Sequence, residues 1–355
     1  MRIKKVLIKK YENIKKKSFV ISLCVAAVFG IVPGSVWAAD EAKVYTKTDF
    51  AMDTVISETL YTTGDDITDE LTQTLKNVEE EMLSWTVETS QIYQINQSAG
   101  STVSISEELA GYLKQILELS ENSDGAMDPT MGEVIRLWDI GGEDPKIPEK
   151  EELDPLLANV GYEKVVLEGN QVTMPKGVTL DLGAAGKGIG CDAVLKVLEA
   201  HSEISGAILN LGGSSVMTYQ EKPDGSLWQV AVTDPRDTQG DYLGVVALSG
   251  TEFLSTSGDY EKYFMENDIR YHHILDPSTG YPADSGLASV TIVCDDGLAA
   301  DGLSTACFVL GWEGAQELLE IYDADGLFVD DSGNIFLTEG MKERFQLLKD
   351  TYTIS

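Results

Sequence analysis

A glycine-rich turn, TLDLGAAGKGIGCD at residues 179–192, joins the β-like segment VTLDL to the helix-like segment AVLKVLEA. A strand that ends in such a turn and opens a helix presents free N–H groups and a positive helix dipole, which favours phosphate. The known phosphate loops do not match, because Asp181 and Gly188 stand where a Walker loop needs Gly and Ser or Thr, and the glycines alternate instead of following G-x-G-x-x-G. The alternative is a tight strand-to-helix turn with a surface lysine.

The rest of the chain mixes helical and strand-like segments without a regular repeat. Apolar periodicity predicts helices over 66–85 and 106–122, the second with Ser106 as its N-cap, and two more near 299–310 and 313–322. The acidic, proline-bearing segment 141–155 is predicted to be a surface loop. Short strands are predicted over 54–61, 206–213, 227–234, 245–258 and 288–294, with hairpin turns at 169–170 and 331–333. This order favours an α+β fold with mixed, largely antiparallel sheets and packed helices over a doubly wound sheet.

The first 39 residues predict an export signal. Lysines extend to Lys17, an apolar run covers 19–32, and Val36-Trp37-Ala38 offers a cleavage site that could equally lie one residue later. Leu23-Cys24 lies near the start of the apolar run, which is wrong for a lipoprotein cleavage site. We expect a protein outside the cytoplasmic membrane, with residues 40–355 as one large domain or two intimate subdomains; an uncleaved membrane anchor is the alternative.

The charge of the chain excludes one class of partner. Its formal net charge is −33, and removal of residues 1–39 takes away eight basic residues and one acidic residue, leaving −40. Nucleic-acid binding is therefore not expected, because it needs clustered Lys and Arg. The remaining cysteines, Cys191, Cys294 and Cys307, are too few and scattered for a disulfide scaffold or a zinc site.

Two adjacent histidines, His272 and His273, precede the turn DPSTGYP. Neighbours in a strand point to opposite faces, so at most one of them faces a given cleft. A histidine there could act as general base for a hydroxyl nucleophile, titrating near pH 6.5 if unperturbed. The alternative is a structural pair with one histidine packed and one solvated.

Asp301 and Thr305 are spaced i, i+4 in a predicted helix and therefore share a face. A carboxylate and a hydroxyl are hard oxygen ligands of the kind that Mg²⁺ prefers. The alternative is a helix-start carboxylate near the positive dipole end, with Thr305 only packed. Asp128-Pro129 sets a turn before a short helix, and by itself it is more typical of a cap than of a ligand.

The order and wording of these segments together resemble the ApbE-like flavin transferase family, over about residues 45–345. The matching blocks are AMDT (51–54), MDPT (127–130), LDLGAAGKGIGCD (180–192), LNLGGS (209–214), STSGDYEKYF (255–264), HHILDPSTGYP (272–282) and ADGLSTACFVLG (300–311). The resemblance implies an ApbE-like flavin transferase fold and an Mg²⁺-dependent FAD:protein FMN transferase. Such an enzyme splits the FAD pyrophosphate, attaches FMN through a phosphoester to a Ser or Thr of a target protein, and releases AMP.

The resemblance also implies roles for individual residues. His273 is expected to be the general base for the acceptor hydroxyl, and Lys187 to contact FAD. Mg²⁺ is expected to be held by Asp301, Thr305 and the backbone carbonyl of Ala184. The flavin and adenine sites are expected to be lined by Met52, Ser84, Trp85, Thr86, Asp128 and Ile274. Two positions depart from the family pattern: Asp53 replaces the glycine of Met-Gly-Thr, and Gly186 stands where alanine is common.

The acceptor is expected to be another protein, because the chain has no Ser/Thr-Gly-Ala-Ser/Thr acceptor stretch, the nearest being SDGAM at 123–127. The resemblance implies an exported or membrane-associated acceptor with an FMN-binding domain. Two alternatives share the same residues or part of them. One is an FAD pyrophosphatase that yields FMN and AMP, and the other is an exported flavin-binding protein without turnover.

Overall fold

The computed structural model describes residues 42–237 and 240–355, so the predicted export signal lies outside the described residues. Ala42–Ser355 form one compact unit. In this part of the chain, no helix combines the length and the hydropathy that a bilayer-spanning segment needs. Helices pack on mixed, largely antiparallel sheets, which confirms the predicted α+β fold class.

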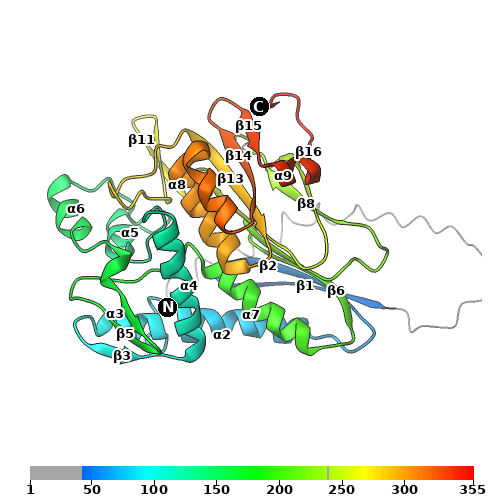
Figure 1. Ribbon diagram of the computed structural model, residues 1–355, viewed down its shortest axis with the longest axis horizontal. Helices are drawn as coiled ribbons and strands as arrows, with labels where there is room; N and C mark the ends of the chain where they lie inside the picture. The colour runs from blue at the N-terminus through cyan, green and yellow to red at the C-terminus, as the bar shows by residue number, and fades with distance from the viewer. Residues whose placement is uncertain (1–41, 238–239) are drawn as a thin grey trace, which may run out of the picture. The chain divides into compact units, whose positions relative to one another are not determined.

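Among the described residues, the largest sheet has nine strands in the order β1-β2-β6-β7-β10-β13-β14-β15-β17 (Figure 1). Its pairs are antiparallel except for β15 with β17. The strands are β1 (Lys43–Ala51), β2 (Thr54–Thr62), β6 (Ile204–Leu211), β7 (Ser215–Tyr219), β10 (Phe253–Gly258), β13 (Leu287–Cys294), β14 (Asp325–Asp330), β15 (Asn334–Leu337) and β17 (Thr353–Ile354).

Smaller sheets accompany it. One has the order β16-β9-β8, a second β3-β5-β4, and a third is the hairpin β11-β12. Their strands are β3 (Thr102–Ser104), β4 (Val166–Glu168), β5 (Gln171–Thr173), β8 (Trp228–Thr233), β9 (Tyr242–Leu248), β11 (Tyr263–Glu266), β12 (Ile269–His272) and β16 (Phe345–Leu347).

The helices gather mainly on one side of the large sheet. They are α2 (Thr68–Asn77), the π-helical turn η2 (Val78–Leu83), α3 (Gln91–Gln97), α4 (Glu107–Asn122), α5 (Gly132–Trp138), α6 (Lys150–Leu157), the short 3₁₀ turn η3 (Tyr162–Lys164), α7 (Gly186–Ala200), α8 (Gly297–Ile321) and α9 (Glu339–Arg344). Ser106 caps α4 as predicted, accepting a hydrogen bond from the Leu109 N–H at 3.1 Å. A left-handed residue, Gly311 with φ 73°, divides α8 where two helices were predicted.

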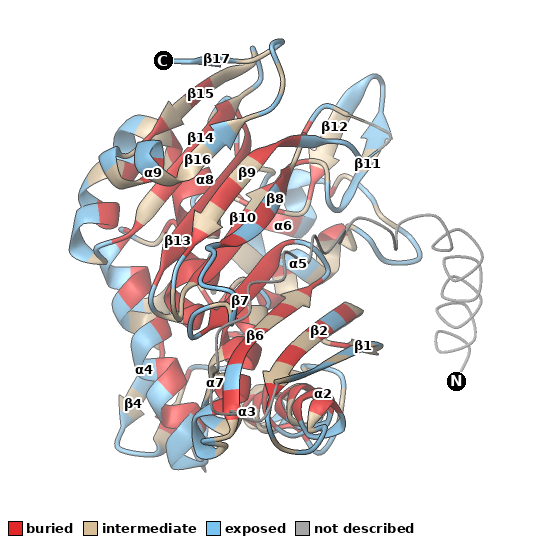
Figure 2. Ribbon diagram, turned by 90° about the vertical axis from the view of Figure 1, so that its right-hand side faces the viewer, coloured by how far each residue is buried: buried red, intermediate tan, exposed pale blue. Residues whose placement is uncertain are grey.

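The central strands are buried on both faces, which Figure 2 shows as red along β7, β10 and β13. Neighbouring residues of a strand enter different hydrophobic clusters: Phe253 and Ile292 pack toward the helices, and Leu254 and Val293 pack toward β8 and β9. All eight residues of β13 are buried. The strands therefore lie in the middle of three layers, helices on one face and a small sheet on the other.

Four sequence predictions need correction. The segment VTLDL is extended, but its β-pairing is a single bridge between Thr179 and Met131. The side-chain amide of Asn96 takes the place of a neighbouring strand, since it donates to the Leu180 carbonyl at 2.9 Å and accepts from the Leu180 N–H at 2.7 Å. The helix predicted over 66–85 ends at Leu83, and its last part is π-helical.

The third and fourth corrections concern a predicted loop and a predicted strand. The predicted loop 141–155 contains the start of α6, which a capping box between Glu149 and Glu152 stabilises. The predicted strand 245–258 is two strands in different sheets, β9 and β10, separated by a turn at Gly250 with φ 63°. The acidic composition concealed the start of α6, whereas the polar stretch Ser249-Gly250-Thr251-Glu252 does mark the boundary between β9 and β10.

Candidate active site

The glycine-rich turn is held by a carboxylate from a distant part of the chain. The N–H groups of Lys187 and Gly188, in the first turn of α7, both donate to Asp301 Oδ2, at 3.1 and 3.0 Å. The first N–H groups of a helix have no partner within it, so Asp301 satisfies two donors that would otherwise be unpaired. The structure thus brings together two of the predicted site residues, Lys187 and Asp301.

Asp301 is buried, with 5% of its surface exposed, and its second oxygen also has a partner within the protein. Oδ1 accepts from Ser215 Oγ at 3.2 Å, and Ser215 in turn accepts from Ser255 Oγ at 3.2 Å. A carboxylate offers about four acceptor positions, and three hydrogen bonds occupy three of them. The remaining position on Oδ1 is available to a metal ion.

Thr305 lies one helical turn after Asp301 and is half-buried. Its Oγ1 is 3.3 Å from Ser257 Oγ, which also lies 2.8 Å from Ser304 Oγ. Ala184 is half-buried in the turn directly before α7, whose first residues contact Asp301. A carboxylate with a spare lone pair, a hydroxyl and a backbone carbonyl suit Mg²⁺, which takes the rest of its shell from water or phosphate.

No group of three or more His, Cys, Asp or Glu side chains in the described residues is arranged to hold a metal. The predicted ligand set contains a single carboxylate, that of Asp301, together with a hydroxyl and a backbone carbonyl.

The side chain of Lys187 is fixed over the turn between β6 and β7. Its Nζ donates to Ser214 Oγ at 2.8 Å. Gly212 and Gly213 precede Ser214 with φ of 71° and 85°, a left-handed pair that non-glycine residues rarely adopt. The lysine is therefore oriented by the protein rather than free in solvent, which disfavours the alternative of a surface lysine.

His273 directly follows β12 and is held in one tautomer. Its Nδ1 is 3.2 Å from the Lys262 carbonyl oxygen, which also accepts from the His273 backbone N–H at 3.0 Å. A carbonyl oxygen can only accept, so Nδ1 carries the proton and Nε2 keeps its lone pair. Burial, together with the positive charges of Lys262 and Lys187, lowers the pKa of His273 to about 3. The imidazole is therefore neutral at neutral pH and its Nε2 can accept a proton, but a pKa this low makes it a weak base.

His272 faces the other way, as strand alternation predicts. It is buried, its ring packs edge-on against Phe308 with the centroids 5.4 Å apart, and its Nε2 lies 3.2 Å from the Ala283 carbonyl. Its Nδ1 has no hydrogen-bond partner in the described part of the chain. Burial lowers the pKa of His272 as well. These contacts are those of a core histidine, so the geometry favours His273 for the chemistry.

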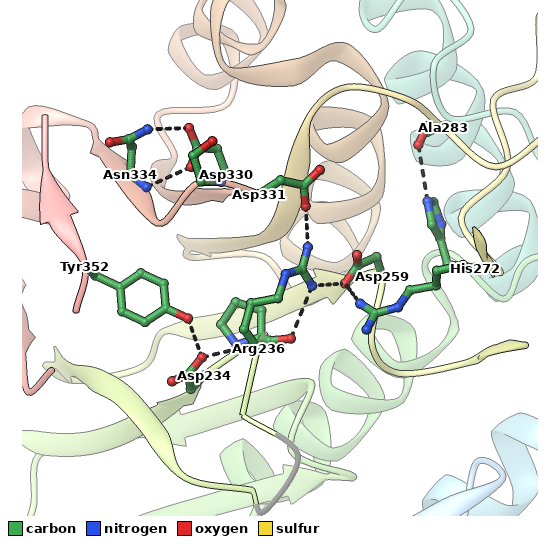
Figure 3. A network of polar contacts seen from close by, with 12 residues as sticks. Asp234, Arg236, Asp259, His272, Ala283, Asp330, Asp331, Asn334 and Tyr352 are labelled. Carbon is green, nitrogen blue, oxygen red and sulfur yellow. Dashed lines mark hydrogen bonds and ion pairs between the residues drawn. The ribbon is translucent and has the colours of Figure 1, made fainter. Parts of the chain in front are cut away.

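An ion network around the buried Asp259 anchors β12, the strand that ends at His272 (Figure 3). Asp259 accepts from Arg236 Nη1 at 2.7 Å and from Arg270 Nη1 of β12 at 2.8 Å, and Arg236 also pairs with Asp331. On the opposite face of the strand, Tyr271 stacks on Phe264 with the ring centroids 5.3 Å apart. Contacts on both faces thus fix β12, and with it the backbone at His273.

Met52 lies in the two-residue turn between β1 and β2. Met52 and Asp53 both have positive φ, 54° and 55°, which defines a tight turn of the type that favours glycine. The Met52 N–H donates to Glu79 Oε2 at 2.7 Å. Asp53 therefore adopts the conformation that a glycine would adopt there, because short polar side chains tolerate the left-handed region.

The predicted flavin-site residues Ser84, Trp85 and Thr86 follow η2 directly. Ser84 Oγ accepts from the Thr86 N–H at 3.2 Å, and the indole of Trp85 is 39% exposed. The guanidinium of Arg136 stacks on that indole at 4.4 Å from the ring centroid. An exposed aromatic surface beside a cation suits a flat, anionic ligand.

Asp128 and Ile274 have partners inside the protein. Asp128 accepts from the Thr130 and Tyr162 N–H groups, each at 2.8 Å, and burial raises its pKa. Ile274 is buried. Their predicted ligand contacts stay predictions, and the structure adds a role for Asp128 in fixing the loop before η3.

Cavities elsewhere do not mark this site. One of about 1000 Å³ lies beside α9 and is lined by Trp312 and Phe336, among others, and another of about 860 Å³ includes His272 and Arg236. Neither is lined by Lys187 or Asp301. The candidate site rests on its convergent groups.

Sequence reasoning missed several contributors, namely Asn96, Asp192, Ser214, Ser215 and the carbonyl of Lys262. Their contacts join positions 27 to 106 residues apart or use the backbone, so no local spacing indicates them. Gly188 is also constrained by a distant segment. It lies in helix α7, and a Cβ there would lie 2.0 Å from the Gly297 carbonyl oxygen.

The comparisons with known proteins agree with this geometry. A family model described as the ApbE family matches residues 52–328. The FAD:protein FMN transferase of Treponema pallidum (strain Nichols) is 32% identical over 298 residues, covering 79% of this chain and 82% of that protein. The enzyme of the same name from Haemophilus influenzae (strain ATCC 51907 / DSM 11121 / KW20 / Rd) is 32% identical over 294 residues, covering 80% and 83%.

Solved structures show the same fold. The ApbE protein from Thermotoga maritima superposes with a TM-score of 0.78 at 32% identity, covering 85% of this chain and 99% of that one. The Pseudomonas stutzeri flavinyl transferase ApbE, in its apo form, gives a TM-score of 0.76 at 28% identity, covering 87% and 99%.

Proposed function

This chain belongs to the ApbE family and is a transferase, and we propose that it is an exported, Mg²⁺-dependent FAD:protein FMN transferase. The single observation that carries the proposal is the position of Asp301, whose carboxylate joins the Lys187 turn to the helix of Thr305 and retains one free acceptor position. A flavin carrier without turnover would need neither this arrangement nor a neutral, tautomer-fixed histidine.

In the proposed reaction, a Ser or Thr hydroxyl of the acceptor attacks the phosphorus on the FMN side of the FAD pyrophosphate. Nε2 of His273 takes the hydroxyl proton, a new P–O ester bond forms, the pyrophosphate P–O bond breaks, and AMP leaves. Lys187 orients the nucleotide. Asp301, Thr305 and the Ala184 carbonyl would hold Mg²⁺, which when bound neutralises charge on the pyrophosphate.

Mass spectrometry of an acceptor tests the proposal. An exported or membrane-associated protein with an FMN-binding domain is incubated with this protein, FAD and Mg²⁺. We expect one Ser- or Thr-containing peptide to gain the mass of FMN less one water, together with one AMP per transfer. Release of free FMN and AMP with an unmodified acceptor would support the alternative, an FAD pyrophosphatase, and recovery of intact FAD would support a flavin-binding protein without turnover.

Export is supported by the composition of residues 1–39, a lysine-rich start followed by an apolar run. The large negative charge of the remainder suits a protein in solution outside the membrane. The N-terminus of the protein isolated from its host tests this: a start near residue 39 in the extracytoplasmic fraction is expected, and an intact N-terminus in the cytosol would refute export.

A further inference from the structure

Asp192 forms a second carboxylate contact between α7 and α8. Asp301 of α8 accepts from N–H groups of α7, whereas Asp192 of α7 accepts from N–H groups of α8. Asp192 lies one helical turn after Gly188 on α7. Its Oδ1 accepts from the Gly297 N–H at 2.8 Å, and its Oδ2 accepts from the Leu298 N–H at 2.9 Å. Gly297 and Leu298 are the first two residues of α8. Each helix therefore supplies the carboxylate that satisfies the first N–H groups of the other.

The backbones touch where these contacts meet. A Cβ at Gly188 would lie 2.0 Å from the Gly297 carbonyl oxygen, and a Cβ at Gly297 would lie 2.6 Å from both the Gly188 carbonyl oxygen and Asp192 Oδ1. We call Asp192, Gly188, Gly297 and Asp301 the helix junction. There is no space in it for a side chain, so the close approach of the backbones and the two carboxylates together hold the helix ends at this spacing.

We propose that Asp192 is a positioning residue for the metal site: it holds the first turn of α8 against α7 and so fixes Asp301 and Thr305 relative to the Ala184 turn. The inference rests on the proposed Mg²⁺ site. Asp301 lies one helical turn after Gly297 in α8, and Ala184 lies in the turn before α7. A shift between the helices therefore changes the separation of the expected ligands, although Asp192 itself touches none of them.

The local cap of α8 provides a matched control. Asp296 Oδ1 accepts from the Ala299 N–H at 2.8 Å, which is an ordinary N-cap within one helix. Asp192 and Asp296 thus both satisfy N–H groups of the same helix end, but only Asp192 connects that end to α7. Substitution of either aspartate should therefore affect the stability of α8. Only substitution of Asp192 should also affect the metal site.

Asp192→Asn is the decisive variant. The amide oxygen of this variant could accept from only one of the two N–H groups, of Gly297 and Leu298. Its NH₂ group would face the other N–H, so two donors would meet within hydrogen-bond distance. The first turn of α8 must move to relieve this contact. Loss of a partner that orients metal ligands weakens metal binding by about 10- to 100-fold, and we expect about tenfold here.

The experiment measures Mn²⁺ binding by electron paramagnetic resonance, with FAD present and the acceptor protein omitted so that no transfer occurs. Wild type, Asp192→Asn and Asp296→Ala are compared, each with its unfolding midpoint. We expect the Mn²⁺ dissociation constant to rise about tenfold in Asp192→Asn and to stay within about twofold in Asp296→Ala, even where both lose stability.

Equal Mn²⁺ affinity in Asp192→Asn and wild type overturns the inference, as does an equal loss in both variants, which would indicate general destabilisation of α8. If wild type binds no Mn²⁺, the proposed metal site fails first, and the two failures are thereby distinguished. If Asp192→Asn does not fold, Asp192→Ser, which retains a single acceptor oxygen without an opposing donor, replaces it under the same criteria.

Discussion

Replacing Gly188 by alanine tests the helix junction most directly, because three neighbouring glycines of α7 differ in the space that they leave. A Cβ at Gly186 would meet only Leu83 Cδ1, at 3.8 Å, an ordinary van der Waals contact. A Cβ at Gly190 would lie 3.0 Å from the end of the Leu75 side chain, which can move. At Gly188 the nearest atoms are the Gly297 carbonyl oxygen and carbon, at 2.0 and 2.5 Å.

The expected magnitude follows from these distances. Ordinary C···O contacts are about 3.3–3.6 Å, so α7 and α8 must separate by more than about 1 Å in Gly188→Ala. Overpacking of this kind costs about 1–3 kcal/mol. The same shift weakens the hydrogen bonds to Asp301, worth about 1.5–3 kcal/mol each when one partner is charged. The gain in helix propensity, about 1 kcal/mol, offsets part of this. We expect a net loss of about 3 kcal/mol.

Urea unfolding followed by tryptophan fluorescence measures the difference, with Gly186→Ala as control. Gly186→Ala should keep or raise the free energy of unfolding by up to about 1 kcal/mol, Gly190→Ala should fall between, and Gly188→Ala should lose most. The order of the three variants is the test. Equal stability of Gly188→Ala and Gly186→Ala, with unchanged FAD binding, would show that the two helices are not held at this contact.

Four further predictions concern chemistry and pH. His273→Ala should abolish transfer and retain FAD binding in a calorimetric titration, while His272→Ala should lose stability and keep transfer; equal rates would remove histidine from the mechanism. Because the pKa of His273 is lowered to about 3, the single-turnover transfer rate of wild type should stay flat from pH 8 to pH 5, and a fall near pH 6.5 would show an unperturbed base. Asp301→Asn, or excess EDTA on wild type, should slow FAD cleavage by about a hundredfold or more, and full activity in either would exclude the metal. Burial raises the pKa of Glu58 from 4.5 to about 7, so the folded state keeps a proton that the unfolded chain releases. The free energy of unfolding should therefore fall by up to about 3 kcal/mol as the pH rises from 4.5 to 7. Glu58→Gln should make this fall smaller in urea titrations.

Local patterns in the sequence predicted what short-range physics decides. The N-cap at Ser106, the turn at Gly333 and the opposite faces of His272 and His273 all follow from backbone geometry within a few residues. The shared face of Asp301 and Thr305 follows from helical spacing. Family resemblance then joined these fragments into one site.

The sequence predictions fail where the hydrogen-bond partner of a segment lies far away along the chain. VTLDL has the composition of a strand, but its hydrogen bonds go to Asn96 and to the loop before α5, which no local rule identifies. The role of Asp192 depends on N–H groups 105 and 106 residues away. Single-sequence reasoning finds which residues can carry chemistry, and it cannot find which distant groups hold them in place.

The glycine-rich turn illustrates the difference. Its sequence predicts free N–H groups for phosphate, yet two of them, on Lys187 and Gly188, are already bonded to Asp301. Glycine at position 188 is needed because α8 approaches closely enough to deliver that carboxylate, not because a ligand does. A carboxylate in such a position would repel a pyrophosphate unless a cation lay between them. Under the proposed function, the turn would recognise phosphate indirectly. It fixes the buried carboxylate of Asp301, and a divalent cation held by that carboxylate, rather than the helix N-terminus, would be the partner of FAD.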